Sequence, residues 1–253
     1  MAFALARADT KRNVRGQGIR MKARHRIAVV GSALVAAALL GASGAAPARA
    51  AATCTKPPQP ASVEVNVAEP AVKFDHSLSK PELAKRAAAE MGHGHGEGSI
   101  VFGLTAGQLR SQLAVHTLLE KRRDGVYCGS PARVIATVGY EGAIAVHVAR
   151  EHPKGTCQHK AILDHEMKHV AVFKEALRDH KKRLRKALEG ALAKAKFPIT
   201  GRDREAVEAE VGKRFEAAFK RAVAEADSDR DRRNARLDTP ESYRRTRDLC
   251  DSW

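Results

Sequence analysis

The stretch ILDHEMKHVAVF, residues 162–173, contains His165, Glu166 and His169 in the arrangement H-E-x-x-H. Apolar residues flank this arrangement at helical spacing, so the stretch predicts a buried helix. On a helix His165 and His169 are one turn apart, about 40° around the axis, and both imidazoles face the same side. Two neutral imidazoles on one face are suited to holding a Zn²⁺ ion.

Glu166 lies on the flank of the same helix face, about 100° from His165. From this position a carboxylate can act as the general base for a zinc-activated water without binding the ion itself. The alternative is a surface helix rich in His and Glu, since the chain holds 11 histidines. The motif follows the strongest strand signal of the chain, at 132–151, and this order favours the metal site.

The sequence leaves the third zinc ligand open. The candidates are Glu205, Glu208 and Glu210 in the second long helix, and Asp238, Glu241 and Tyr243 in LDTPESY (237–243). If the motif helix continues, it turns Glu175 away and carries His180 about 22 Å along the axis from His165. Tyr140 and Tyr243 are candidate donors to the oxyanion of a hydrolytic reaction.

Strand signals come first along the chain. SVEVNV (62–67) alternates, and ARVIATVGYEGAIAVHVARE (132–151) predicts two strands joined as a hairpin at Tyr140-Glu141-Gly142. Between them, SLSKPELAKRAAAEMG (77–92) predicts a capped helix, whereas 103–122 fits either a helix or strands. The strands are expected to form a small, twisted, antiparallel-rich sheet.

Helical signals follow. From Gln158 apolar residues recur at three- and four-residue spacings as far as Phe197-Pro198, and a second helix begins near Arg202. The two helices are expected to pack as a long hairpin. Strands first and long helices after them predict an α+β fold of the zincin-like kind, with residues 62–253 as one catalytic domain.

The first 50 residues are expected to be an N-terminal extension and a secretory signal peptide, followed by a linker at 51–61. A basic segment at 21–26 precedes an uncharged apolar run at 27–40, and Ala48-Arg49-Ala50 has the pattern of a signal peptidase site. The apolar run is shorter than the roughly 20 residues of a spanning helix, so cleavage after Ala50 is favoured over a membrane anchor. We therefore expect a secreted or periplasmic protein.

Removing residues 1–50 lowers the net charge. They hold nine Lys and Arg and one Asp, so the mature chain has 36 basic and 28 acidic residues and a net charge of +8, against +16 for the whole chain. Basic clusters at 181–186 and 230–236 suit an anionic cell-envelope surface, although a solvated helix face is the simpler explanation. Nucleic acid is a poor partner for an exported protein. The low aromatic content of 4% also disfavours polysaccharide and nucleic acid as targets, and the expected substrate of a zincin-like site is a peptide or protein.

All four cysteines, Cys54, Cys128, Cys157 and Cys250, lie in the mature part. An even count in an exported chain predicts two disulfides, for which three pairings exist. No C-x-x-C pair is present, which argues against a cysteine zinc site or a thioredoxin-type redox site.

The remaining histidines carry weaker signals. His93 and His95 in HGHGEG (93–98) could bind metal adventitiously, and His159 could support the motif from just before it. A packed or exposed strand residue is the simpler interpretation of His147.

Four stretches carry a family resemblance: GLTAGQL (103–109), YCGSPARV (127–134), VHVAREHPKGTCQHKAILDHEMKHVAVF (146–173) and LDTPESY (237–243). Together they resemble the bacterial secreted proteins of the DUF922 type, a family expected to be zinc-dependent proteases. The resemblance implies a zincin-like core with His165 and His169 as zinc ligands and Glu166 as the catalytic base. Many members end in a D-x-x-T-x-H pattern whose His could complete the site, and Tyr243 occupies that position here.

These observations predict a secreted zinc-dependent metallopeptidase in which Glu166 activates a water at a Zn²⁺ ion. Two alternatives stay open. The first is a zincin-like envelope protein that has lost activity and has no catalytic use for Glu166. The second is a helical interaction module, with 158–225 as its working surface, in which the histidine motif is incidental and binds no metal.

Overall fold

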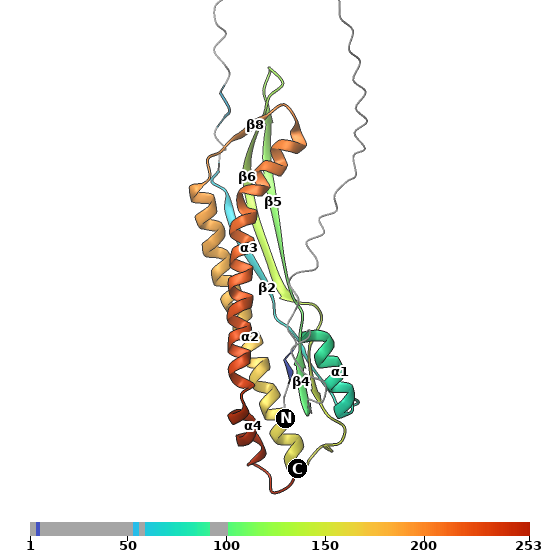
Figure 1. Cartoon of the computed structure of the whole chain (residues 1–253). Helices are drawn as coiled ribbons and strands as arrows, with labels where there is room; N and C mark the ends of the chain where they lie inside the picture. Colours follow the sequence, from blue (N-terminus) through green and yellow to red (C-terminus); the bar gives the residue numbers. More distant parts are fainter. Residues whose placement is uncertain (1–3, 6–52, 56–58, 92–100) are drawn as a thin grey trace, which may run out of the picture. The chain divides into compact units, whose positions relative to one another are not determined.

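The computed structural model describes residues 4–5, 53–55, 59–91 and 101–253, which form two mixed sheets and four helices (Figure 1). The expected signal peptide with its cleavage site, part of the linker, and His93 and His95 lie outside these residues. One compact unit comprises Met1–Asp9 and Cys54–Trp253, and the second, Thr10–Thr53, falls almost entirely outside the described residues. Within the described part of the chain, no helix has the length and apolar character needed to cross a membrane.

The larger sheet is built on a long antiparallel hairpin of β5 (Leu109–Lys121) and β6 (Tyr127–Tyr140). Side chains of β5 alternate between partly buried and exposed, so the stretch that fitted either a helix or strands forms strands. The connecting turn places Gly125 at a φ of 82°, a conformation that favours glycine. β2 (Ser62–Ala68) lies parallel to β6, and β8 (Ile199–Gly201) pairs with the start of β6.

The smaller sheet has the strand order β1-β4-β7-β3. β7 (Ile144–Val148) pairs antiparallel with β4 (Gly103–Ala106) and parallel with β3 (Val72–Asp75), and β1 (Ala4–Leu5) lies parallel to β4. The expected hairpin at Tyr140-Glu141-Gly142 is therefore wrong, because β6 and β7 enter different sheets. The sheets are also mixed rather than antiparallel-rich, since parallel partners arrive from earlier in the chain and local alternation does not reveal them.

Local sequence signals define the helix ends. α1 (Lys80–Met91) begins with a capping box, in which the Glu82 carboxylate accepts hydrogen bonds from the Ser79 amide at 2.7 Å and hydroxyl at 2.6 Å. Side-chain caps also begin the other three helices: Thr156 for α2 (Cys157–Lys194), Asp203 for α3 (Arg204–Leu237) and Thr239 for α4 (Pro240–Arg247). The α+β class is confirmed, and α2 and α3 form the long helical hairpin that the apolar spacing predicts.

The main core lies between this hairpin and the larger sheet, along which Figure 1 shows α2 and α3 running side by side. Its buried members include Val134, Ala136 and Val138 of β6, Val170, Phe173 and Leu177 of α2, and Phe215 of α3. Burial of one such large apolar side chain stabilises a fold by roughly 1.5–3 kcal/mol. Val170 and Phe173 face this core. Their packing also buries the neighbouring His165, Glu166 and His169 of α2.

His180 lies in a polar cluster buried between α2 and α3. Its side chain is fully buried, Nε2 lies 3.7 Å from Asp227 Oδ1, and neither ring nitrogen has a hydrogen-bond partner among the described residues. The buried Arg230 pairs with Asp227 at 3.1 Å. Burial, with smaller contributions from Arg230 and Arg183, lowers the pKa of His180 to about 4 against the opposing effect of Asp179.

We expect this histidine to make the fold less stable in acid. Its pKa in the unfolded chain is near 6.5, so between pH 6.5 and about 4 the unfolded state binds a proton that the folded state does not. The free energy of unfolding should therefore fall by about 3 kcal/mol as the pH drops through this window, since one pKa unit is worth about 1.4 kcal/mol. Urea unfolding measured between pH 7 and pH 4 determines the loss.

His180→Gln is the matched control, because it removes the titrating group and leaves Asp227 and Arg230 in place. The variant should lose clearly less stability over the same pH range than the unsubstituted protein. Parallel stability curves for the two proteins would show that another group is responsible.

Candidate metal centre

All three residues of the H-E-x-x-H motif are buried in the structure. His165 and His169 are 1% exposed and Glu166 is 0% exposed. His165 Nε2 and His169 Nε2 lie 3.2 Å apart, as one-turn spacing on a common helix face predicts. Their burial follows from the apolar neighbours on the same helix, since Ile162 and Val170 are both core residues. The motif therefore does not lie on a solvent-exposed helix face.

Asp238 joins the two histidines from the end of α3, where it is the C-cap residue. Asp238 Oδ1 lies 3.3 Å from His165 Nε2 and 3.2 Å from His169 Nε2, so the three ligand atoms form a nearly equilateral triangle. A tetrahedral Zn²⁺ with nitrogen and oxygen ligands about 2.05 Å away spaces those atoms about 3.3 Å apart. Among the described residues, this is the one group of three such side chains whose ligand atoms lie within 4.8 Å of one another.

Two further side chains orient these ligands. Asn234 lies one turn before Asp238 on α3, and its Oδ1 accepts a hydrogen bond from His169 Nδ1 at 3.2 Å. In the neutral ring this bond places the proton on Nδ1 and leaves a lone pair on Nε2 that faces the other ligand atoms, whereas the protonated ring can also donate from Nε2 to Asp238. The Tyr243 hydroxyl of α4 donates to Asp238 Oδ1 at 2.8 Å, and its ring centroid lies 5.7 Å from that of His165.

Glu166 faces strand β4. The Thr105 hydroxyl donates a hydrogen bond to Glu166 Oε2 at 2.7 Å. Gly103 on the same strand permits this close approach, because a Cβ there would lie 2.6 Å from Glu166 Oε1 and 2.7 Å from a methyl carbon of Ile162. Glu166 Oε1 is buried and has no hydrogen-bond partner among the described residues. A buried carboxylate oxygen without a partner can still accept a proton or a further hydrogen bond.

The charges of the cluster favour a cation. Burial raises the pKa of Glu166, against lowering effects of His169 and His165. Burial also acts to raise the pKa of Asp238, but hydrogen bonds from His165 and His169 outweigh it and hold this pKa below its usual range. Burial favours the neutral ring of His169, yet Asp238 and Glu166 raise its pKa overall. The cluster therefore attracts positive charge, which either a proton or a metal ion can supply.

The centre is closely surrounded by protein. A small apolar core of Phe102, Val148, Ile162 and Tyr243 lies beside it. Asp238 has a side-chain exposure of 13%, the largest of the three ligands. A ligand from solvent therefore reaches the centre most directly on the side of Asp238 and α4.

The other carboxylates considered as third ligands lie elsewhere. Glu241 is exposed and pairs with Arg245 at 2.9 Å. Glu205 and Glu208 stand in the first turns of α3, a helix of 34 residues, about 45 Å or more along its axis from Asp238. Glu210 lies close to them and pairs with Arg214 at 2.9 Å. The antiparallel hairpin brings the C-terminal end of α3 to the motif, and not its N-terminal end.

Several other candidate residues make contacts outside the centre. Glu175 pairs with Arg233 (3.3 Å), the Tyr140 hydroxyl donates to the Phe173 carbonyl (3.2 Å), His147 lies against Asp75 (3.1 Å), and His159 lies against the ring of His76 (4.7 Å between centroids). His180 belongs to the polar cluster described above. Of the two tyrosines considered as oxyanion donors, Tyr243 is the one beside the ligand atoms.

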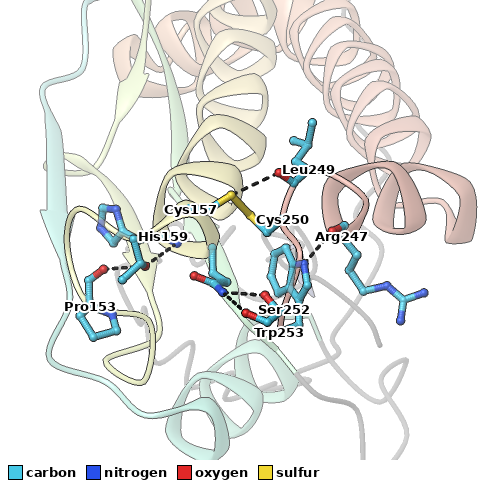
Figure 2. Close-up of a disulfide and its surroundings, with 10 residues drawn as sticks. Pro153, Cys157, His159, Arg247, Leu249, Cys250, Ser252 and Trp253 are labelled. Carbon is cyan, nitrogen blue, oxygen red and sulfur yellow. Dashed lines mark hydrogen bonds between the residues drawn. A yellow bond between two sulfur atoms is a disulfide. The ribbon is translucent and has the colours of Figure 1, made fainter.

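The two expected disulfides are present as Cys54–Cys128 and Cys157–Cys250, which decides among the three pairings. The second joins the first residue of α2 to the segment that follows α4 (Figure 2). In the same segment the Trp253 indole donates to the Arg247 carbonyl at 2.7 Å. The C-terminal segment, which includes Asp238 and α4, is therefore covalently linked to α2, the helix that carries the motif.

Three residues around the centre are not predicted by the sequence: Gly103, Thr105 and Asn234. Asn234 precedes Asp238 by four residues, the spacing of one helix face, and this signal could have identified it. Gly103 and Thr105 share one face of a strand, but nothing in their stretch shows that this face meets the motif helix.

Comparison with known proteins assigns no family and no function to this chain. No known family model, curated protein or solved structure matches the chain. The function is therefore inferred from the arrangement of the centre and from the sequence.

Proposed function

We propose that this protein is a zinc-dependent hydrolase that cleaves peptide bonds, with His165, His169 and Asp238 as zinc ligands. The observation that carries the proposal is the triangle of ligand atoms, whose sides of 3.2–3.3 Å match the edge of a zinc tetrahedron. Three protein ligands leave the fourth tetrahedral position open, as catalytic zinc sites do and closed structural sites do not.

The residues around the ligands have separate parts in the proposed reaction. A bound Zn²⁺ would supply Lewis acidity toward a water molecule and the substrate carbonyl. Glu166, held through Oε2 by Thr105, accepts the proton of the attacking water on its carboxylate and passes it to the leaving amine. The Tyr243 hydroxyl points at the ligand atoms and would turn its proton from Asp238 Oδ1 to the carbonyl oxygen as that oxygen becomes negative.

The substrate class and the location rest on the sequence. The resemblance to DUF922-type proteins supports a zincin-like peptidase, and two disulfides fit an exported chain released by cleavage after Ala50. An anionic envelope surface is a weaker proposal for the basic clusters, because Arg183, Arg230 and Arg233 already pair with carboxylates within the hairpin.

Metal analysis of the mature, oxidised protein is the first test. We expect one zinc ion per chain, and none in a His165→Ala/His169→Ala double variant, because two of three ligands are removed. The zinc-loaded protein should hydrolyse peptides of mixed sequence, read out by mass spectrometry. Glu166→Gln should keep its zinc and slow hydrolysis by about 100-fold or more, since a general base contributes roughly 10²–10⁴-fold.

Thr105→Val is the matched variant for the support of Glu166, because it keeps the side-chain volume and removes the hydroxyl. It should slow hydrolysis less than Glu166→Gln does and leave zinc content unchanged. A protein that takes up no zinc on reconstitution would refute the proposal, and so would undiminished hydrolysis by Glu166→Gln.

A second candidate function is that of a zincin-like envelope protein in which zinc serves the fold alone. The observation in its favour is the near-complete burial of the centre, where Glu166 is 0% exposed. Both candidates predict zinc, but this one predicts that no peptide is cleaved and that Glu166→Gln changes no phenotype. The helical interaction module is disfavoured, because an incidental motif gives no reason for Asp238 to complete a ligand triangle.

A further inference from the structure

A cavity adjoins the centre on the side of α4. It is lined by Pro240, Tyr243, Arg244 and Arg247, and its volume is about 190 Å³. Tyr243, Arg244 and Arg247 follow Pro240 by three, four and seven positions, so a single face of α4 forms the wall. The volume is below the roughly 300–1,000 Å³ of sites for whole small molecules, and it suits one side chain or one chain end.

Tyr243 is shared by the cavity and the metal centre. Its hydroxyl bonds to Asp238 Oδ1 at 2.8 Å, and its ring packs against His165 with 5.7 Å between centroids. The two sites are therefore separated by about one side chain. An extended peptide advances about 3.3–3.6 Å per residue, so two or three residues bridge this separation.

The cavity is positively charged. None of the described residues that line it is acidic, and the exposed Arg244 has no ion-pair partner in the part of the chain that the structure describes. Arg245, outside the cavity, pairs instead with Glu241 at 2.9 Å. Figure 2 shows the Arg247 side chain pointing away from the disulfide and from Trp253. Guanidinium groups bind carboxylates through paired, charge-assisted hydrogen bonds, so a carboxylate is the ligand that this wall suits best.

We infer that the cavity binds a carboxylate of the peptide substrate. Arg244, on the wall that Arg247 also lines, then makes the protein prefer peptides with a negative charge two or three residues from the scissile bond. This inference rests on the proposed function and names the substrate class of the same centre. The carboxylate is either an Asp or Glu side chain or the C-terminus of the peptide, and in the second case the protein releases short C-terminal fragments.

Peptide binding tests this inference separately from hydrolysis. The zinc-loaded Glu166→Gln protein keeps the cavity and turns peptide over slowly, so its affinity for degenerate fluorescent octapeptide pools can be measured by anisotropy. Four pools combine Asp or Asn at a fixed central position with a free or an amidated C-terminus. We expect about 10-fold tighter binding of the pools that carry the recognised carboxylate, and the comparison shows whether it is a side chain or a terminus.

Arg244→Gln, made in the same background, should bind all four pools as weakly as the amidated Asn pool. Arg245→Gln is the matched control, because Arg245 is an exposed neighbour outside the cavity, and it should keep the preference. Equal affinities for all four pools, or an unchanged preference in Arg244→Gln, would overturn the inference. A preference abolished by Arg244→Gln in a protein that cleaves nothing would establish the carboxylate site and refute the proposed hydrolase.

Discussion

Asp238→Ala is expected to weaken zinc binding by about 100- to 1,000-fold. Protein zinc sites bind with roughly 10–16 kcal/mol, so one ligand of three or four accounts for about 3–4 kcal/mol. Each 1.4 kcal/mol is a tenfold change in affinity. Asp238 Oδ1 lies as close to the two histidine nitrogens as they lie to each other, which makes it an equal member of the set. Competition with a chromophoric zinc chelator measures the change.

Glu241→Ala is the matched control for this measurement. Glu241 lies three residues further along, in the stretch that the sequence offers for the third ligand, but it is exposed and pairs with Arg245. Its removal should leave zinc affinity within about twofold of the unsubstituted protein. If Glu241→Ala weakened binding and Asp238→Ala did not, the ligand set proposed from the structure would be incorrect.

The sequence predicts the part of the centre that lies on one helix. His165, Glu166 and His169 could be recognised because helical periodicity fixes how residues on the same helix face one another. The third ligand could not be chosen, because LDTPESY offers Asp238, Glu241 and Tyr243 together and the second long helix offers further carboxylates. Only the packing of α3 against α2 brings Asp238 to His165, 73 positions away in the chain.

The sheets show the same limit. Alternation in 132–151 locates β6 and β7, since it reports which side chains of a strand are buried. It does not report which strands are neighbours, and the tight turn at Gly142 joins two strands that pair in different sheets. The position of β4 against Glu166 depends on this topology, which is why Thr105 and Gly103 were not predicted as site residues.

Removing the Cys157–Cys250 disulfide is expected to lower both stability and zinc affinity. The bond closes a sequence separation of 93 residues, for which the loop-entropy relation gives about 4–5 kcal/mol. Measured effects of a disulfide on stability are often smaller than this relation gives. Cys157→Ser/Cys250→Ser should therefore lower the free energy of unfolding by about 2–5 kcal/mol. The variant also frees the segment that follows α4 from α2. Because Tyr243 of α4 bonds to Asp238, a looser α4 should lower zinc affinity by about 10-fold. Urea unfolding of the metal-free protein and chelator competition measure the two effects separately.

The Cys54–Cys128 disulfide is an internal control of similar loop length. Its separation of 74 residues implies an entropic contribution only about 0.2 kcal/mol smaller than that of the other bond. It ties the chain before β2 to the start of β6, and neither cysteine belongs to the group of ligand side chains. Cys54→Ser/Cys128→Ser should therefore lose comparable stability and keep its zinc affinity. Equal losses of zinc affinity in both variants would mean that binding follows the stability of the whole fold. No loss in either would mean that packing of α3 on α2 alone positions Asp238.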